Sequence, residues 1–560
     1  MNERTGPVGR VLSCAPVASI GSAPELESSR GRAPRWVSPI VLAVVAAAVA
    51  FNVSARLVQS TLCCGDDALF AVPAKNLAFG EGYLATFPPA QTRAHDVRLF
   101  DTSATTTGPT LVVPVAAAIH LFGNRYWVPG AVTALASVAL LAALAATWRR
   151  LLGPDAWLAL TLLIVILQLV TIDHYVFWFT LLGELPASLL VVLAASLLAG
   201  EARRPRRAFA AGLGLGAAIL TKSVAAIGVA AIAATLAGLA VAALWTSRRG
   251  TPRPALVPWR ALFAGGLGCV LPLAAFDAWK LSSLGWSGYV QLKADERLFL
   301  ASHDGSGIGY LTRAGLDGVA TTLHTNWGVL AKFLGGSTSE VALLAALTVG
   351  VVAFRRAREP AERLVLLLAA AALAHAGWWL FISFAGWTRH LAPGLVYLCA
   401  ATAVAVRRWP LDRRAAALAA LMVIALAPRS NRLGEVVARA PYFEPDPRTR
   451  AMLLTAAYLE GLEPGHLKAA TSWASVQDLE YLAPGSRNFV QYRFVAPRDR
   501  PGTYLVGSSR WDAKSRKLAA DWQQIVDAWG GELVFEAKPY MVYRSRIGAD
   551  PGSDPAAATP

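Results

Sequence analysis

Long apolar runs, separated by short clusters of arginine, fill the first three quarters of the chain. A membrane-spanning helix needs about 20 apolar residues, and runs of that length cover approximately 36–57, 127–147, 155–172, 178–199, 257–277, 363–385 and 390–406. Two shorter runs, 341–354 and 414–427, are flanked by charged residues. This pattern predicts an all-α polytopic membrane domain.

The apolar stretch from 207 to 245 is too long for a single span. As one helix it would extend about 57 Å, roughly twice the thickness of the hydrocarbon layer. We therefore expect two spans here, with Lys222 near the middle marking the turn between them.

The short apolar segment 109–122 decides the topology. If it crossed the membrane, Arg149, Arg150 and the later arginine clusters would all face outward. If it lies in the outer interface, or dips into the membrane and returns, every cluster faces the cytoplasm, as the positive-inside rule requires. We therefore expect about eleven spans, with the N-terminus inside, the C-terminus outside, and long outer loops at 58–126 and 278–340.

The soluble C-terminal region contains alternating strand and helix patterns. A strand is expected from about 469, another at 502–506, an amphipathic helix at 517–529 and a hairpin over 532–543. The predicted organisation is a disordered cytoplasmic tail (1–34), the membrane domain (35–427), a small extracytoplasmic α/β domain (428–547) and a disordered tail (548–560).

Composition supports an integral membrane protein, and we expect it in the inner or plasma membrane. The 560 residues are 55% hydrophobic and only 16% charged, against about 25% charged in soluble domains. The net charge of +16 lies mainly in clusters between apolar runs, so it indicates membrane topology and not nucleic-acid binding. Five cysteines in so long a chain do not indicate a disulfide framework.

Two adjacent carboxylates, Asp66 and Asp67, follow the first span by about nine residues, which places them at the level of the outer headgroups. Such a carboxylate could take a proton from an acceptor hydroxyl or hold a divalent cation. The alternative is structural, because acidic residues also stabilise the N-terminus of a helix. Both interpretations stay open on spacing alone.

Several charged residues are predicted near the same outer surface. Lys222 lies at the outward turn, Arg389 and His390 lie at the outer end of a span, and Glu184 lies near the outer end of another. A charge within a span costs about 2.5–3.5 kcal/mol or more, so these residues need a polar cavity or a partner. Glu184 could pair with Lys222 for that reason alone, or the group could line a cavity suited to phosphate. Three residues of the first outer loop could add to such a cavity: His95, Asp96 and Asp101.

At these positions the chain resembles the GT-C superfamily, in the branch that contains protein O-mannosyltransferases and the aminoarabinose transferases of lipid A. The resemblance covers about the first 400 residues and rests on five segments in order: Asp66-Asp67, the glycine-proline-threonine-leucine segment 108–111, Gly183 to Pro186, Leu220 to Lys222, and Arg389-His390. The chain departs from the family at Asp67, where glutamate is commoner, and at Gly108, where many members have lysine.

The resemblance implies a glycosyltransferase that uses a sugar on a polyprenyl phosphate and inverts the anomeric carbon. Asp66 would act as the general base, with Asp67 beside it, while Lys222, Arg389 and His390 would bind the donor phosphate. The acceptor would be a lipid, a glycan or a protein. No cofactor is implied with certainty, and the two aspartates permit a divalent cation without requiring one.

Two other functions compete with this interpretation. A multi-pass transporter or flippase would show internal repeats and broken spans at matching positions, and neither is evident in the sequence. A non-catalytic scaffold could keep the fold without the chemistry. The sequence leaves the sugar, the acceptor class and the metal requirement open.

Overall fold

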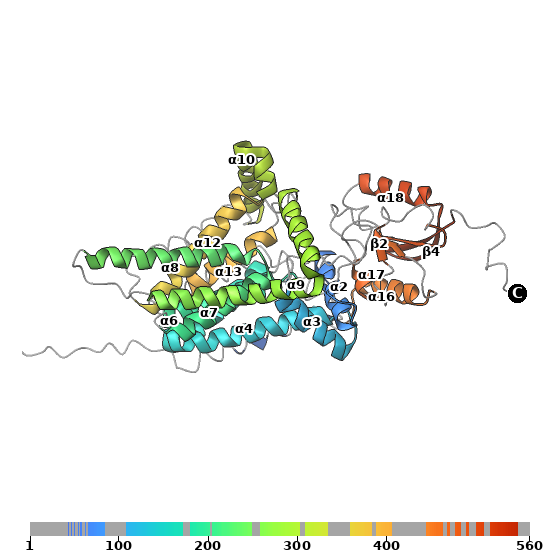
Figure 1. Ribbon diagram of the computed structural model, residues 1–560. Coiled ribbons are helices and arrows are strands. Elements are labelled where there is room, and N and C mark those ends of the chain that lie inside the picture. The colour runs from blue at the N-terminus through green and yellow to red at the C-terminus, as the bar shows by residue number, and fades with distance from the viewer. Residues whose placement is uncertain are drawn as a thin grey trace, which may run out of the picture.

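The computed structural model describes a helical bundle with a mixed β-sheet at one end (Figure 1). The residues described are isolated positions between 43 and 62 and the ranges 65–83, 108–171, 180–201, 204–248, 258–302, 308–333, 359–383, 388–405, 444–462, 468–470, 477–482, 489–491, 500–508 and 516–546. The predictions for 341–354, 414–427 and both tails lie outside this part of the chain, as does most of 36–57.

The bundle is built from helices whose positions follow the apolar runs of the sequence. They are α2 (Gly65–Ala78), α3 (Pro109–Phe122), α4 (Val128–Leu152), α5 (Ala156–Thr171), α6 (Glu184–Glu201), α7 (Pro205–Thr221), α8 (Ala225–Arg248), α9 (Trp259–Ser302), α10 (Ile308–Phe333), α12 (Pro360–Phe381) and α13 (Thr388–Ala405), with the short turn η1 (Gly153–Asp155) between α4 and α5. The predicted division of 207–245 at Lys222 is confirmed by the boundary between α7 and α8.

Within the described residues, four segments are long and apolar enough to cross a membrane: Val128–Ile164, Ala225–Trp245, Trp259–Ala294 and Pro360–Phe381. Pro109–Phe122 and Glu184–Gly200 are shorter apolar helices. At 14 residues, α3 would extend about 21 Å, less than the roughly 30 Å of hydrocarbon that a span crosses. Its length agrees with the interfacial position expected for 109–122.

The bounds of two helices differ from those predicted, and in each case a glycine with a positive φ lies at the difference. Helix α6 begins at Glu184 and not near 178, because Gly183 adopts a φ of 81° that a continuous helix does not allow. Glu184 is therefore the first residue of its helix. The expected outer loop 278–340 is largely helical, since α9 continues to Ser302 through a kink at Gly285 and α10 follows.

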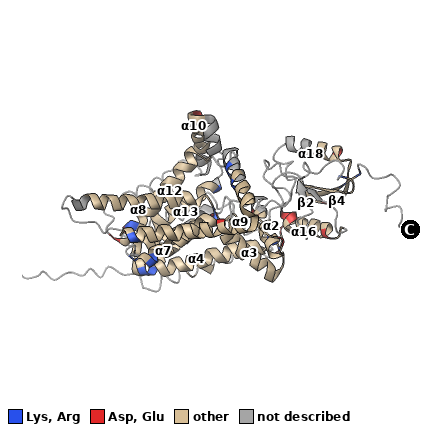
Figure 2. Ribbon diagram, in the orientation of Figure 1, with Lys and Arg blue, Asp and Glu red and all other residues tan. Residues whose placement is uncertain are grey.

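Basic residues gather at the end of the bundle away from the β-sheet (Figure 2). Helix α4 ends with Arg149 and Arg150, and α7 begins beside Arg204 and contains Arg206 and Arg207 in its first turn. These clusters therefore share one end of the molecule, in agreement with the expected positive-inside pattern.

Glycines on α7 allow it to pack closely against α9. A Cβ added at Gly212 would lie 2.0 Å from the carbonyl oxygen of Gly265, and one at Gly216 would lie 2.3 Å from that of Cys269. Small residues four apart let two helices in a membrane approach until their backbones touch. This contact joins the two helices into one rigid layer.

At the opposite end from the basic clusters, α2 and α3 form a small layer with a core of their own. Phe70 and Val72 of α2 and Leu111 and Val115 of α3 belong to one buried cluster, which also contains Leu181 before α6. The packing of this shared cluster therefore holds the two short helices against the rest of the bundle.

The C-terminal sheet has the strand order β2-β1-β3-β5-β4. Its strands are β1 (Lys468–Ala470), β2 (Phe489–Gln491), β3 (Tyr504–Ser508), β4 (Gly531–Ala537) and β5 (Tyr540–Ser545), and its helices are α16 (Pro447–Glu460), α17 (Gln477–Leu482) and α18 (Arg516–Ala528). Strand β1 pairs in parallel with β2 and β3, whereas β5 pairs antiparallel with β3 and β4. The strands and the helix expected at 469, 502–506, 517–529 and 532–543 lie within a residue or two of these bounds.

Adjacent side chains of β3 face opposite sides of this sheet, as a pleated strand requires. Val506 packs in a cluster with residues of α16 and α17, whereas Leu505 packs with Val526 and Trp529 on the α18 side. Helices α16 and α17 therefore cover one face of the sheet, and α18 covers the other.

Candidate active site

The two adjacent aspartates lie in the first turn of α2, beginning one residue after its start at Gly65. Asp67 is buried, with 1% of its surface exposed, and its Oδ1 accepts a hydrogen bond from the main-chain amide of Leu181. This bond ties the start of α2 to the segment that leads into α6. The side chain of Asp66 lies outside the described part of the structure.

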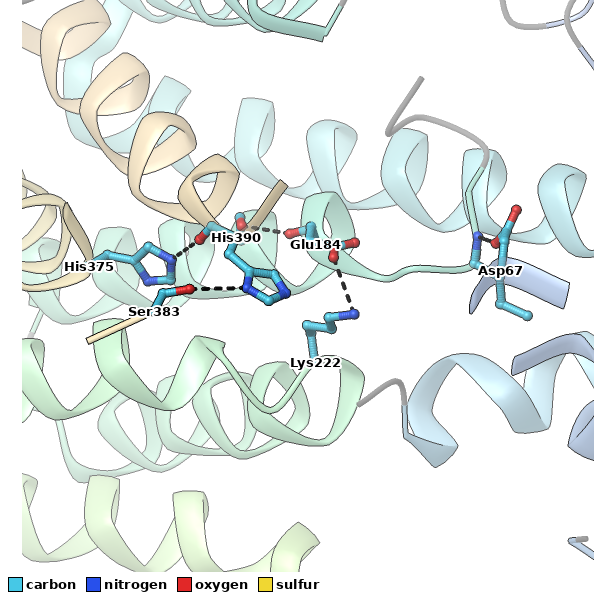
Figure 3. Close-up of polar contacts among 8 residues, drawn as sticks. Asp67, Glu184, Lys222, His375, Ser383 and His390 are labelled. Carbon is cyan, nitrogen blue, oxygen red and sulfur yellow. Dashed lines mark hydrogen bonds and ion pairs between the residues drawn. The ribbon is translucent and has the colours of Figure 1, made fainter. Parts of the chain in front are cut away.

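Glu184 and Lys222 form a buried ion pair between α6 and the turn that follows α7 (Figure 3). The Nζ of Lys222 lies 3.2 Å from Oε1 of Glu184, and the two side chains are 5% and 1% exposed. Removing two such charges from water is costly unless they neutralise each other. The pairing that the sequence allowed is therefore present, and it places both charges at one site.

Lys222 also faces α2, because its Nζ lies 5.2 Å from the centre of the Phe70 ring. Residues four apart share one face of a helix, so Asp66 and Phe70 lie on the same face of α2. Position 66 is therefore on the face of α2 that is directed toward Lys222.

His390 is held beside this pair where α12 ends and α13 begins (Figure 3). Its Nδ1 lies 3.3 Å from Oγ of Ser383, and Nε2 of the fully buried His375 donates to its main-chain carbonyl at 2.7 Å. Lys222 and Arg389 both lie close enough to act electrostatically on the His390 ring. Lys222 and His390 are thus both placed beside Glu184 (Figure 3), and Arg389 adjoins His390 in the chain.

Helix α10 supports the segment that carries Ser383. The Nδ2 of Asn326 donates to the carbonyl of Trp379 at 2.6 Å and to that of Ser383 at 2.9 Å. Because Asn326 is buried, these bonds fix the end of α12 against α10 in a region shielded from water.

The start of α3 docks directly onto the turn that contains Lys222. The amide of Gly108 donates to the Thr221 carbonyl at 3.3 Å, and the hydroxyls of Thr110 and Thr221 lie 2.8 Å apart. A Cβ at position 108 would lie only 2.0 Å from the Leu220 carbonyl oxygen. The glycine at 108, where many members of the resembling family have lysine, is therefore required by this close approach.

An apolar groove lies between the last turn of α2 and helix α3. It is lined by Leu77, Ala78, Val113, Ala116, Ala117, His120 and Leu121. An apolar lining does not suit a phosphate group, so the groove is not the phosphate site.

Other predicted site residues lie beyond the described residues. His95, Asp96 and Asp101 fall within the range 84–107, and their roles stay predictions. Among the described side chains, no three metal-ligating groups gather in one place. Because the Asp66 side chain is not among them, the divalent cation at Asp66 and Asp67 also stays a prediction.

Comparison with known proteins identifies the fold. The chain is similar to two crystal structures of ArnT from Cupriavidus metallidurans, one in the apo state and one bound to undecaprenyl phosphate. The TM-scores are 0.52 and 0.51, each with 14% sequence identity and with 91% of this chain and 98% of that chain covered. The chain has an ArnT-like fold. No protein-family model and no curated protein matches the sequence.

The ArnT-like fold extends past the resemblance seen in the sequence, which covered about the first 400 residues. Sequence reasoning missed three polar residues that support the site: Asn326, His375 and Ser383. A signal existed for His375, because a lone histidine in an apolar run usually has a partner or faces a cavity. Asn326 and Ser383 gave none. Asn326 bonds two main-chain carbonyls, and Ser383 reaches Nδ1 of His390 only through the packing of α12 against α13.

Proposed function

We propose that this chain is a membrane glycosyltransferase that moves a sugar from a polyprenyl-phosphate donor to an acceptor hydroxyl. The observation that carries the proposal is the likeness to ArnT over 91% of the chain, with undecaprenyl phosphate bound in one of the two neighbours. The buried cationic group around Lys222 adds to it, because a lipid phosphate at the outer end of the helices needs fixed positive charge.

The proposed reaction assigns these groups the roles that the resemblance to the GT-C superfamily implies. Asp66 takes the proton of the acceptor hydroxyl, and the oxygen attacks the anomeric carbon opposite the phosphate. The bond between that carbon and the phosphate oxygen breaks, and the lipid phosphate leaves with the electron pair. Lys222 and Arg389 neutralise the charge that develops on the phosphate, and the attack inverts the anomeric configuration.

Asp67 has a different role in this proposal, because its Oδ1 already binds the Leu181 amide in a buried position. It positions the first turn of α2, which leaves Asp66 as the general base. His390 completes the phosphate site beside Arg389. His95, Asp96 and Asp101 remain candidates for the substrate cavity, together with Glu184.

The proposed location is the inner or plasma membrane, with the site on the extracytoplasmic side. Three features support this orientation: the basic ends of α4 and α7, the position of α2 and α3 at the other end, and about eleven expected spans. In this arrangement the C-terminal α/β unit is also extracytoplasmic, and it can contact the acceptor. The sugar and the class of acceptor remain to be identified.

Replacement of the proposed base is the test. Asp66→Asn, in membranes supplied with polyprenyl-phosphate sugar and the native acceptors, should reduce transfer at least about 100-fold, the lower end of general-base effects. The control is Asp527→Asn, because Asp527 is an exposed carboxylate on α18 that bonds only Gln523 in the described contacts.

Mass analysis of lipid and glycan products measures the transfer in both variants. Transfer that survives in Asp66→Asn would remove Asp66 from its proposed role. Movement of intact donor across sealed vesicles, without cleavage of the glycosidic bond, would instead indicate a transporter.

A further inference from the structure

A short helix of the C-terminal unit, α17, docks onto the membrane part of the chain. The last carbonyls of any helix lack partners within the helix, and for α17 the partners come from α2 and from the turn after α3. Nζ of Lys75 donates to the Glu480 carbonyl at 2.5 Å, and Nδ2 of Asn124 donates to the carbonyls of Tyr481 and Leu482. The membrane part therefore caps this helix.

The side chain of Tyr481 makes the same connection through packing. It is fully buried in the cluster that contains Phe70 of α2 and Leu111 of α3. Its Oη donates to the carbonyl of Arg125 at 3.0 Å. A residue of the C-terminal unit is thus part of the core that positions α2.

The other side of α17 is fixed within the C-terminal unit. Oδ2 of Asp478 accepts a hydrogen bond from Oη of Tyr540 at 2.5 Å and pairs with Arg448 at 3.3 Å. Leu479 packs with Val506 of the sheet. Because α17 bonds the membrane part on one side and the C-terminal unit on the other, it connects the sheet to α2 directly.

We infer that α17 is the positioning element for α2: through Lys75 and Tyr481 it holds the helix that carries Asp66 against the Glu184–Lys222 pair. This inference rests on the proposed function, since it assigns the C-terminal unit a part in catalysis. Lys75 follows Asp66 by nine residues, or about 14 Å along one helix, so it acts through the position of α2 and not by contact with substrate. The proposed phosphate-binding residues lie on other elements, α13 and the turn after α7, and none of them bonds α17 directly in the described contacts.

Lys75→Met tests whether α17 affects the position of α2 without affecting donor binding. We expect kcat for sugar transfer to fall about tenfold or more, while KM for the donor changes less than about twofold, because misplacement of a base affects the transition state and not donor binding. Lys75→Arg should restore at least half of the lost turnover, since arginine can still donate to the Glu480 carbonyl. Lys538→Met is the matched control, because the Lys538 side chain is 82% exposed.

Hydrogen exchange of the amides in 65–78 gives a second readout that does not depend on activity. Exchange in α2 should be faster in Lys75→Met than in the wild type and unchanged in Lys538→Met. If Lys75→Met does not fold, Tyr481→Phe, which removes only one hydrogen bond, should show the same faster exchange.

The two measurements distinguish the possible failures. Wild-type turnover and unchanged α2 exchange in Lys75→Met would overturn the inference and leave the proposed function intact. A parallel loss of donor binding and turnover would also overturn it, because that indicates general structural damage. A wild-type protein that does not transfer sugar would refute the proposed function, whereas faster α2 exchange would still support the docking of α17.

Discussion

At the scale of single residues, the site depends on two buried contacts, the ion pair between Lys222 and Glu184 and the bond from the Leu181 amide to Asp67. Lys222 and Glu184 stand out because each is a charge in or beside an apolar run, where an unpaired charge is costly, and they pair at 3.2 Å. The partner of Asp67 could not be predicted in the same way. It is the main-chain amide of Leu181, and every residue other than proline has such a group.

Glu184→Gln should separate the structural use of the ion pair from its use in binding. It leaves the buried Lys222 without its carboxylate, and breaking such a pair costs about 3–5 kcal/mol. We therefore expect a lower Tm without ligand. A polyprenyl phosphate would restore the missing negative charge, so the rise in Tm on its addition should be larger in Glu184→Gln than in the wild type.

Thermal unfolding in detergent, with and without polyprenyl phosphate, measures both effects. Glu536→Gln is the control, because Glu536 forms an exposed pair with Lys538 at 4.0 Å and such pairs contribute only about 0–1 kcal/mol. If polyprenyl phosphate raised the Tm of Glu184→Gln and of the wild type equally, the phosphate would not bind at Lys222.

At the scale of elements, apolar run length predicted the long helices but not their exact ends. Gly183 and Gly285 interrupt otherwise continuous apolar or amphipathic patterns, since their positive φ is a property of the backbone that composition does not reveal. Helix α17 has only six residues, too few for a periodic pattern. Its place is determined by contacts with residues about 400 positions away in the sequence.

The contact between α3 and the Lys222 turn leads to a second prediction. Gly108→Ala would place a Cβ 2.0 Å from the Leu220 carbonyl oxygen, and such overpacking typically costs about 1–3 kcal/mol. The variant should have a lower Tm and reduced transfer, because the Lys222 turn must move. Gly266→Ala is the matched control, since a Cβ there has no neighbour within 4 Å. Equal Tm values for the two variants would contradict the close approach at Gly108.

The docking of α17 should depend on pH through Glu480. Burial raises the pKa of this carboxyl from its usual 4.5 to about 8, and Lys75 opposes part of the rise. The folded state therefore binds a proton that the unfolded state releases between these values. Binding of this proton stabilises the folded state. The stabilisation is complete below about pH 4.5 and is lost as the pH rises through about 8.

Glu480→Gln, which stays neutral, should remove this pH dependence. Measured between pH 5 and 9, the wild type should lose up to about 1.4 kcal/mol of unfolding free energy per pH unit from this group. The variant should lose correspondingly less. Parallel stability profiles would show that Glu480 is not buried in a neutral form.

At the scale of the whole molecule, the arginine clusters predicted the orientation in the membrane. The packing of the C-terminal unit on α2 is seen only in the fold. The two described arginine clusters, at the end of α4 and the start of α7, lie together at one end of the bundle, and α2 with the β-sheet lies at the other (Figures 1 and 2). The sequence alone could assign the C-terminal unit to a side, through the parity of the spans. It could not show that this unit packs on α2, because that contact depends on the tertiary placement of Tyr481.

The central claim is that the cationic group at Lys222 binds the phosphate of a polyprenyl donor on the side opposite the arginine clusters. A cryo-EM structure of the full chain with polyprenyl phosphate tests it most directly. The account predicts a phosphate oxygen at hydrogen-bonding distance, about 2.7–3.2 Å, from Nζ of Lys222, with Arg389 beside it and Asp66 facing the same space. A phosphate bound at the end that carries Arg149 and Arg204, or one held without Lys222, would contradict it.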